Sequence, residues 1–177
     1  VQIEGDTLLI STKKGRNWNW FFGWHRDKTG HGKTVITVRI PQNTLFDTAE
    51  INIGAASLLL DGFTATQRFI LNTGAGEVNV QNITASNVDI KTGVGETIFR
   101  NCNFTDTVMN TGVGETAFEG KIFKNFDINA GIGGTAMRIK GKKTDYLIDA
   151  ISGIGSILID GRKAAGISST FRVNNQN

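Results

Sequence analysis

A six-residue motif, Thr-Gly-Val-Gly-Glu-Thr, occurs twice in this chain, at Thr92–Thr97 and at Thr111–Thr116. Three looser copies begin at Thr73, Ala130 and Ser152. The first glycines of the five copies are separated by 19, 19, 19 and then 22 residues: Gly74, Gly93, Gly112, Gly131 and Gly153. A fixed period near 20 residues is typical of solenoids, in which each repeat covers the apolar face of its neighbour.

Apolar residues recur at fixed positions around each motif. They stand five and three residues before the first glycine, and one and six residues after it. Polar residues such as Asp89 and Asp127 separate the two upstream columns, and this alternation predicts strands with one buried face. The column directly after the glycine is expected to face inward with the others: Ala75, Val94, Val113, Ile132 and Ile154. The column six residues after it predicts that Phe99 and Phe118 stack inside the coils.

The Gly-x-Gly pair predicts a corner that is repeated once per coil. Glycine permits positive φ and a close approach of stacked backbones, so we expect both properties at Gly93 and Gly112. A weaker coil precedes the clear ones, since Gly54 lies 20 residues before Gly74. The predicted fold is therefore all-β: a single-stranded β-helix of about six coils with a period near 19–20 residues.

The two ends of the chain do not follow the repeat. Alternation at 6–12 and at 33–40 predicts the two strands of a hairpin, and an N-terminal hairpin can cover the open end of a β-helix. We expect one β-solenoid domain over 1–177, which consists of three parts. The capping hairpin spans 1–41, the repeat coils span 42–161, and a C-terminal cap strand lies within 162–177.

Charge, residue content and the regular repeat argue against several classes of function. A net charge of +3 over 177 residues argues against a dedicated nucleic-acid binder. The single cysteine, Cys102, is interpreted as a buried apolar side chain, and the two histidines, His25 and His31, form no metal-binding spacing. The regular, short coils leave no room for the walled cleft that a glycosidase or lyase needs. We therefore expect no catalytic residues, no metal, no cofactor and no enzymatic activity.

One column of carboxylates raises an alternative. Glu77, Glu96 and Glu115 each follow a second glycine, so stacking would place them about 5 Å apart in a ladder that could attract cations. The simpler interpretation is a solvated outward row, which the neighbouring Lys91 and Arg100 moderate.

The pattern resembles the DUF4097 family of bacterial adhesin-like proteins with β-strand repeats. The resemblance rests on Gly5–Ile10, on Val38–Pro41 and on the recurring Gly-x-Gly-Glu, and it covers about residues 3–161. Gly134 and Ser156 depart from the acidic residue that the family usually has after the second glycine. The resemblance implies a bacterial, often envelope-associated protein, and it brings no catalytic residues.

All three tryptophans of the chain lie in one cationic, non-repeat segment. Alternation would place four aromatic rings on one side of a strand: Trp18, Trp20, Phe22 and Trp24. They either plug the end of the β-helix or form a ligand-binding patch for a cell-surface protein, a glycan or a membrane surface.

The function we expect is a non-enzymatic envelope or cell-surface binding module, adhesin-like, that presents this aromatic loop. The chain begins at Val1, which suggests a removed signal peptide or anchor and hence a cell-envelope or extracellular location, with the cytoplasmic side of the membrane left open. The alternative function is a self-assembling scaffold that polymerises through the β-helix ends. The expected state is accordingly a monomer or a weak end-to-end oligomer.

Overall fold

The computed structural model describes residues 2–4, 7–10, 36–41, 44–142, 146–165 and 169–173. The chain forms two compact units, Val1–Arg39 and Ile40–Asn177. The elements of the described residues are all strands: β1 (Gln2–Glu4), β2 (Thr7–Leu9), β3 (Leu45–Ala55), β4 (Leu58–Ile139), β5 (Tyr146–Ile159), β6 (Arg162–Ala165) and β7 (Ser169–Val173).

The first unit contains an antiparallel hairpin whose pairing differs from the expected one. β1 pairs with β2, so that Gln2 lies opposite Leu9 and Glu4 opposite Thr7. The expected partner of β2 was the segment 33–40, but residues 36–40 form no strand. Only two residues separate β1 from β2, whereas 20 separate 12 from 33, and a short connection closes at lower entropic cost. That a hairpin covers the end of the solenoid stays a prediction.

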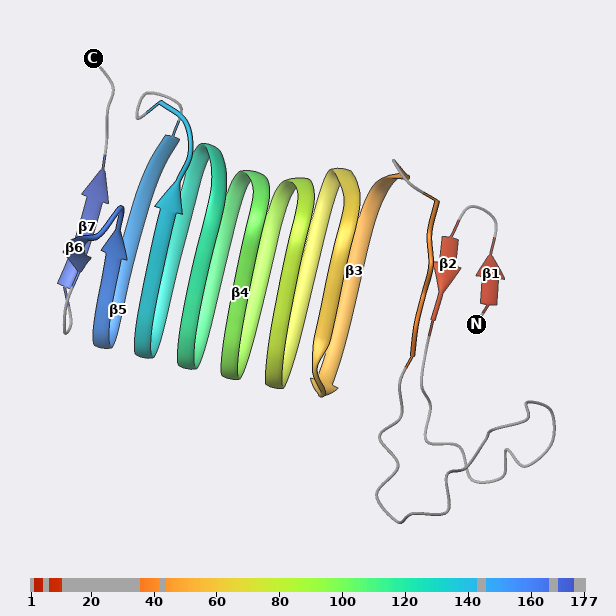
Figure 1. Ribbon diagram of the computed structural model, residues 1–177, viewed down its shortest axis with the longest axis horizontal. Helices are drawn as coiled ribbons and strands as arrows, with labels where there is room; N and C mark the ends of the chain where they lie inside the picture. Colours follow the sequence, from red (N-terminus) through yellow and green to blue (C-terminus); the bar gives the residue numbers. More distant parts are fainter. Residues whose placement is uncertain are drawn as a thin grey trace, which may run out of the picture. The chain divides into compact units, whose positions relative to one another are not determined.

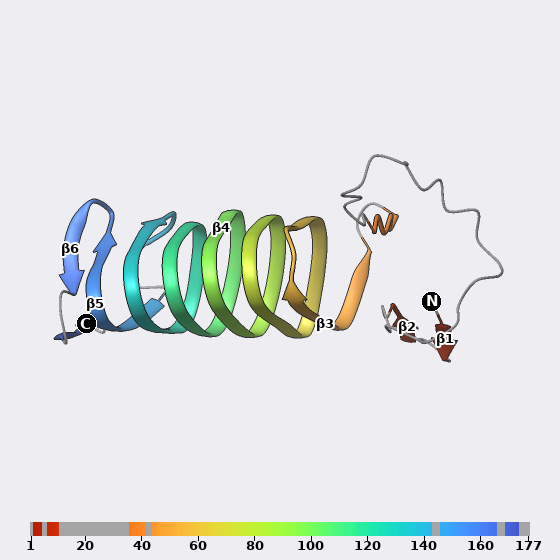
Figure 2. The same cartoon turned by 90° about the horizontal axis from the view of Figure 1, so that it is seen from below.

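The second unit is a β-solenoid of about five turns, which confirms the predicted all-β solenoid fold. β4 winds through 82 residues, and its coils lie side by side between β3 and β5 (Figures 1 and 2). β3 pairs in parallel with β4 at an offset that reaches 20 residues, as at Ile51 and Leu71. β5 pairs in parallel with β4 at an offset of 22 residues, as at Ile128 and Ala150. The offsets equal the spacing of the repeated glycines, so the sequence period is the circumference of one coil.

The interior of the solenoid holds a continuous run of phenylalanine rings. Phe99 and Phe118 are buried with ring centroids 6.3 Å apart and tilted by 46°, which confirms that they are neighbours inside the coils. The ring of Phe104 contacts both, with its centroid 5.8 Å from that of Phe99 and 5.7 Å from that of Phe118. Phe126 follows at 5.4 Å from Phe118. These tilted and edge-to-face contacts avoid the face-to-face arrangement that the quadrupoles of aromatic rings disfavour.

The two glycines of each Gly-x-Gly corner serve different purposes. Only the second has positive φ, for example 135° at Gly95 and 141° at Gly114. The expected positive φ at Gly93 and Gly112 is therefore wrong. The expected close approach of stacked backbones is confirmed at both positions. A Cβ on Gly112, for example, would collide with the carbonyl oxygen of Gly93 in the preceding coil.

The C-terminal end of the solenoid is closed by strands that run against the direction of the coils. β7 pairs antiparallel with the first part of β5, where Ile148 lies opposite Val173. β6 pairs antiparallel with the last part of β5, where Ile159 lies opposite Arg162. Figure 1 shows both strands beside β5. The backbone edge that β5 would offer to another parallel coil is thus largely occupied.

Candidate interaction surface

The aromatic residues singled out from the sequence, Trp18, Trp20, Phe22 and Trp24, lie outside the described residues. Their role as a binding patch stays a prediction. The surface that the structure describes in detail belongs to the solenoid, and its most unusual part runs along the Gly-x-Gly corner.

The residue between the two glycines of each motif points outward, contrary to expectation. Four large aliphatic side chains in this column are about half exposed: Val94 57%, Val113 46%, Ile132 49% and Ile154 60%. Ala75 precedes them in the same column and is also exposed. We call Ala75, Val94, Val113, Ile132 and Ile154 the corner ridge. The inward and outward alternation breaks at the corner because the chain turns there, so the period-two rule does not carry across the glycines.

A groove of about 1,050 Å³ runs beside this ridge across successive coils. Its floor is the bare backbone of the first-glycine column, from Gly54 to Gly153. Its far wall is the column of side chains two residues upstream of these glycines, which is polar at five positions, Asn52, Asn72, Lys91, Asn110 and Asn129, and apolar at the last, Ile151. We call the groove the corner groove and the five polar residues of its wall the amide column.

Neighbouring members of the amide column hold one another by hydrogen bonds. The Nδ2 of Asn72 donates to the Oδ1 of Asn52 at 2.7 Å, and the Nδ2 of Asn129 donates to the Oδ1 of Asn110 at 3.1 Å. Lys91 interrupts the ladder and pairs instead with Asp89 at 3.1 Å, with 59% of its side chain exposed. Each amide has two donors and accepts at one oxygen, so a ladder bond leaves further hydrogen-bonding capacity on the outer side.

The glutamate column, Glu77, Glu96 and Glu115, lies on the other side of the ridge. All three residues are exposed, as the simpler interpretation of this column requires. The column ends at Gly134, where a Cβ would lie 2.6 Å from the Oε2 of Glu115.

The described residues contain no arrangement typical of a metal site. Within these ranges, no group of three or more His, Cys, Asp or Glu side chains could hold a metal ion. A cation ladder along the glutamate column thus gains no support from the geometry. In the described part of the chain, no helix is long and apolar enough to cross a membrane.

Cys102 is a buried thiol, as interpreted from its column. Its Sγ lies 3.4 Å from the backbone oxygen of Arg100 and 3.7 Å from that of Val80. Burial raises the pKa of the Cys102 thiol to about 11, although the backbone hydrogen bonds oppose this shift. A thiol that stays protonated near neutral pH is a poor nucleophile.

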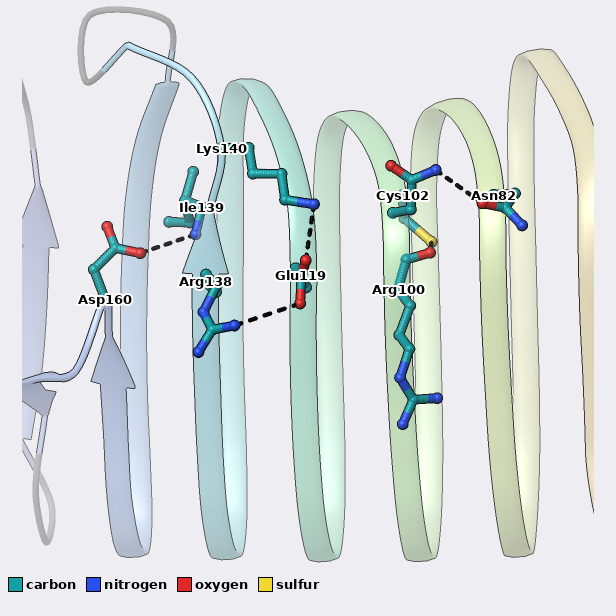
Figure 3. A network of polar contacts seen from close by, with 9 residues as sticks. Asn82, Arg100, Cys102, Glu119, Arg138, Ile139, Lys140 and Asp160 are labelled. Atoms are coloured by element: carbon teal, nitrogen blue, oxygen red, sulfur yellow. Dashed lines mark hydrogen bonds and ion pairs between the residues drawn. The ribbon is translucent and has the colours of Figure 1, made fainter.

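Polar contacts also tie the last coils of β4 together (Figure 3). Glu119 accepts from Lys140 at 2.8 Å and lies 3.8 Å from Arg138, and the hydrogen bond from Lys140 is the main cause that lowers the pKa of the Glu119 carboxyl. The backbone N–H of Ile139 donates to the Oδ1 of Asp160 at 2.9 Å. These bonds connect neighbouring coils and build no reactive site.

Comparison with known families and proteins gives one match. The model of the family described as Toastrack DUF4097 matches residues 2–170. The search of curated proteins and the search of solved structures each found no match.

Proposed function

Because the chain belongs to the Toastrack DUF4097 family, we propose that it is a non-enzymatic binding module of the bacterial envelope or cell surface. The observation that carries the proposal is the regularity of the solenoid. Its coils repeat without an inserted loop between Leu58 and Ile139, and burial of its one cysteine raises the pKa of the thiol. Such a surface suits presentation and contact better than chemical conversion.

Trp18, Trp20, Phe22 and Trp24 are the proposed contact residues of this module. Their concentration in one segment supports the proposal, since tryptophan is enriched at the centres of binding surfaces. The described solenoid interior is filled by phenylalanine and aliphatic side chains, which supports a separate use for the tryptophans. The partner would be an envelope glycan, a cell-surface protein or a membrane surface.

The competing scaffold function requires coils of different copies to stack end to end. β6 and β7 already pair with β5 in the antiparallel sense, so a second copy could add there only after displacing them. This arrangement favours the binding module over the end-to-end filament.

Replacement of all three tryptophans by serine tests the proposed contact. We expect the variant to melt as the wild type does and to lose binding to cell-wall polysaccharide, to vesicles with anionic lipids or to whole cells. A matched control replaces Phe123, an exposed phenylalanine of the solenoid, by serine. Unchanged binding by the tryptophan variant would contradict the proposal, and collapse of its fold would show that the rings are structural.

A further inference from the structure

The columns around the glycine corner follow one another in a fixed order. Around the coils at Gly74, Gly93 and Gly112 come the amide column, the corner groove, the corner ridge and then the glutamate column. A protruding apolar row therefore lies directly beside a hollow row, and a row of amides and one ammonium group is balanced by a row of carboxylates. The ridge is complementary in shape to the groove, and the carboxylates are complementary in charge to the amides and the ammonium group. The same surface on two copies can therefore pair with itself.

We propose that two copies of this chain associate side by side and in parallel, with the corner ridge of each copy in the corner groove of the other. A twofold axis parallel to the solenoid axis reverses the order of the columns on the facing copy. Ridge then meets groove on both sides of the axis, and the glutamate column meets the amide column. A twofold axis perpendicular to the solenoid would place ridge on ridge and carboxylate on carboxylate, which costs free energy.

The spacing of the coils singles out a second copy as the partner. Ridge residues recur once per coil, about 4.8 Å apart along the solenoid. A second copy has the same spacing, so every ridge residue meets the groove at the same level of its partner without cumulative mismatch. In this register Glu96 of one copy faces Lys91 of the other. Glu77 and Glu115 face Asn72 and Asn110, whose amides can donate to a carboxylate.

The present contacts of Lys91 allow this additional partner. Its salt bridge to Asp89 at 3.1 Å is on the surface, and its side chain is 59% exposed. Surface bridges of this kind contribute little stability, so the ammonium can be shared with Glu96 of the second copy at small cost.

The length of the ridge sets the expected strength of the pair. The five ridge residues, from Ala75 to Ile154, span four coil intervals, or about 19 Å. A strip about 19 Å long would have to be about 40 Å wide to reach the ~800 Å² per partner of a standard stable interface, and one ridge with one groove is much narrower. The pair is therefore a weak one, and it leaves β6 and β7 in place because it uses the side of the solenoid. Pairing would give two copies of any weak binding site a joint affinity above that of either.

The test is sedimentation equilibrium of the full chain between about 10 µM and about 1 mM, because a weak pair forms only at high concentration. We expect a monomer–dimer equilibrium in the wild type. The double variant Val113→Lys/Ile132→Lys should weaken association at least tenfold. A charge-matched control, Val108→Lys/Leu158→Lys, changes two exposed aliphatic side chains outside the ridge and should associate as the wild type does.

A charge exchange tests the parallel register. Lys91→Glu and Glu96→Lys should each weaken the dimer severalfold, because each places like charges opposite one another. The variant that carries both changes should recover association, since the pair is then re-formed with reversed polarity. Melting curves of all variants check that the fold is retained. A wild type that stays monomeric at about 1 mM, a ridge variant that still associates fully, or a double charge variant that does not recover would each overturn the proposal.

Discussion

One buried side chain inside the solenoid, Thr107, is polar although its column is otherwise apolar. Thr107 belongs to an interior column whose other members include Val88 and Phe126, and its Oγ1 is buried without a hydrogen-bond partner. A hydroxyl in this state has lost its bonds to water and has gained none in return.

Replacing Thr107 by valine should therefore stabilise the protein. Valine keeps the branched shape and removes the buried hydroxyl, so we expect the free energy of unfolding to rise by about 1 kcal/mol. Urea unfolding of the variant measures this change. Thr105→Val, at a partly exposed position of the same coil, should change the stability little. A loss of stability in Thr107→Val would mean that the hydroxyl has a partner.

Along β4, the first-glycine column is constrained by the distance between coils. A Cβ at Gly112 would collide with the backbone of Gly93, whereas a Cβ at Gly54, in the first coil, would meet nothing within 4 Å. Gly112 and Gly54 thus have different surroundings although they belong to the same column. Gly112 packs on a preceding coil, whereas Gly54 lies in the first coil.

Gly112→Ala should destabilise the protein by at least about 2 kcal/mol, because the preceding coil must move to admit the methyl group. Gly54→Ala should stay within about 0.5 kcal/mol of the wild type. Thermal and urea unfolding of the two variants compare them directly. Equal melting temperatures for both would refute the role of coil contact at this column.

The phenylalanine run joins successive coils of β4 through its ring contacts. Phe118 contacts Phe99, Phe104 and Phe126, so its removal leaves a cavity bordered by three rings. Phe118→Ala should cost about 3–5 kcal/mol, as truncation of a large core side chain does. The matched control is Phe123→Ala, which truncates an exposed ring and should cost far less. A loss below about 1 kcal/mol in Phe118→Ala would contradict the packing.

Near the end of β4, basic neighbours lower the pKa of one carboxyl group, that of Glu119. The pKa of Glu119 is lowered in the folded protein, first by the hydrogen bond from Lys140 and then by its charge. A lowered folded-state pKa contributes stability above the ordinary pKa of the carboxyl, and this contribution is lost as the pH falls through the folded-state value. We expect an NMR titration of Glu119 to show this lowered pKa. Lys140→Met should raise it towards the ordinary range, whereas Lys121→Met should leave it unchanged.

The second compact unit of the chain should fold independently of the first. The buried hydrophobic core of the second unit is built from residues between Phe63 and Ile157, so it does not depend on the first 39 residues. We expect the chain 40–177 to fold alone and to unfold cooperatively. Circular dichroism and thermal melting check this, with the full chain as the reference. Loss of a cooperative transition would show that 1–39 is required, as a capping role for the hairpin would suggest.

Much of the architecture was readable from local repetition. The 19-residue period predicted the coil, the alternating columns predicted the interior phenylalanines, and the column of Cys102 predicted a buried thiol. These predictions held because a solenoid contact joins a residue to its own equivalent one coil away. The spacing along the chain therefore specifies the neighbour in space.

Other features depended on how the coils meet. The sequence indicates a corner at each Gly-x-Gly, but it does not show which glycine has positive φ or that Val94 and Ile154 turn outward there. It also favoured pairing of 6–12 with 33–40, whereas β2 pairs with β1. The repeat thus determined the period, the core columns and the coil, because these follow from local alternation. The three-dimensional fold decided the corner geometry and the outer surface, because the direction of a side chain at a turn depends on the backbone of the coil beneath it.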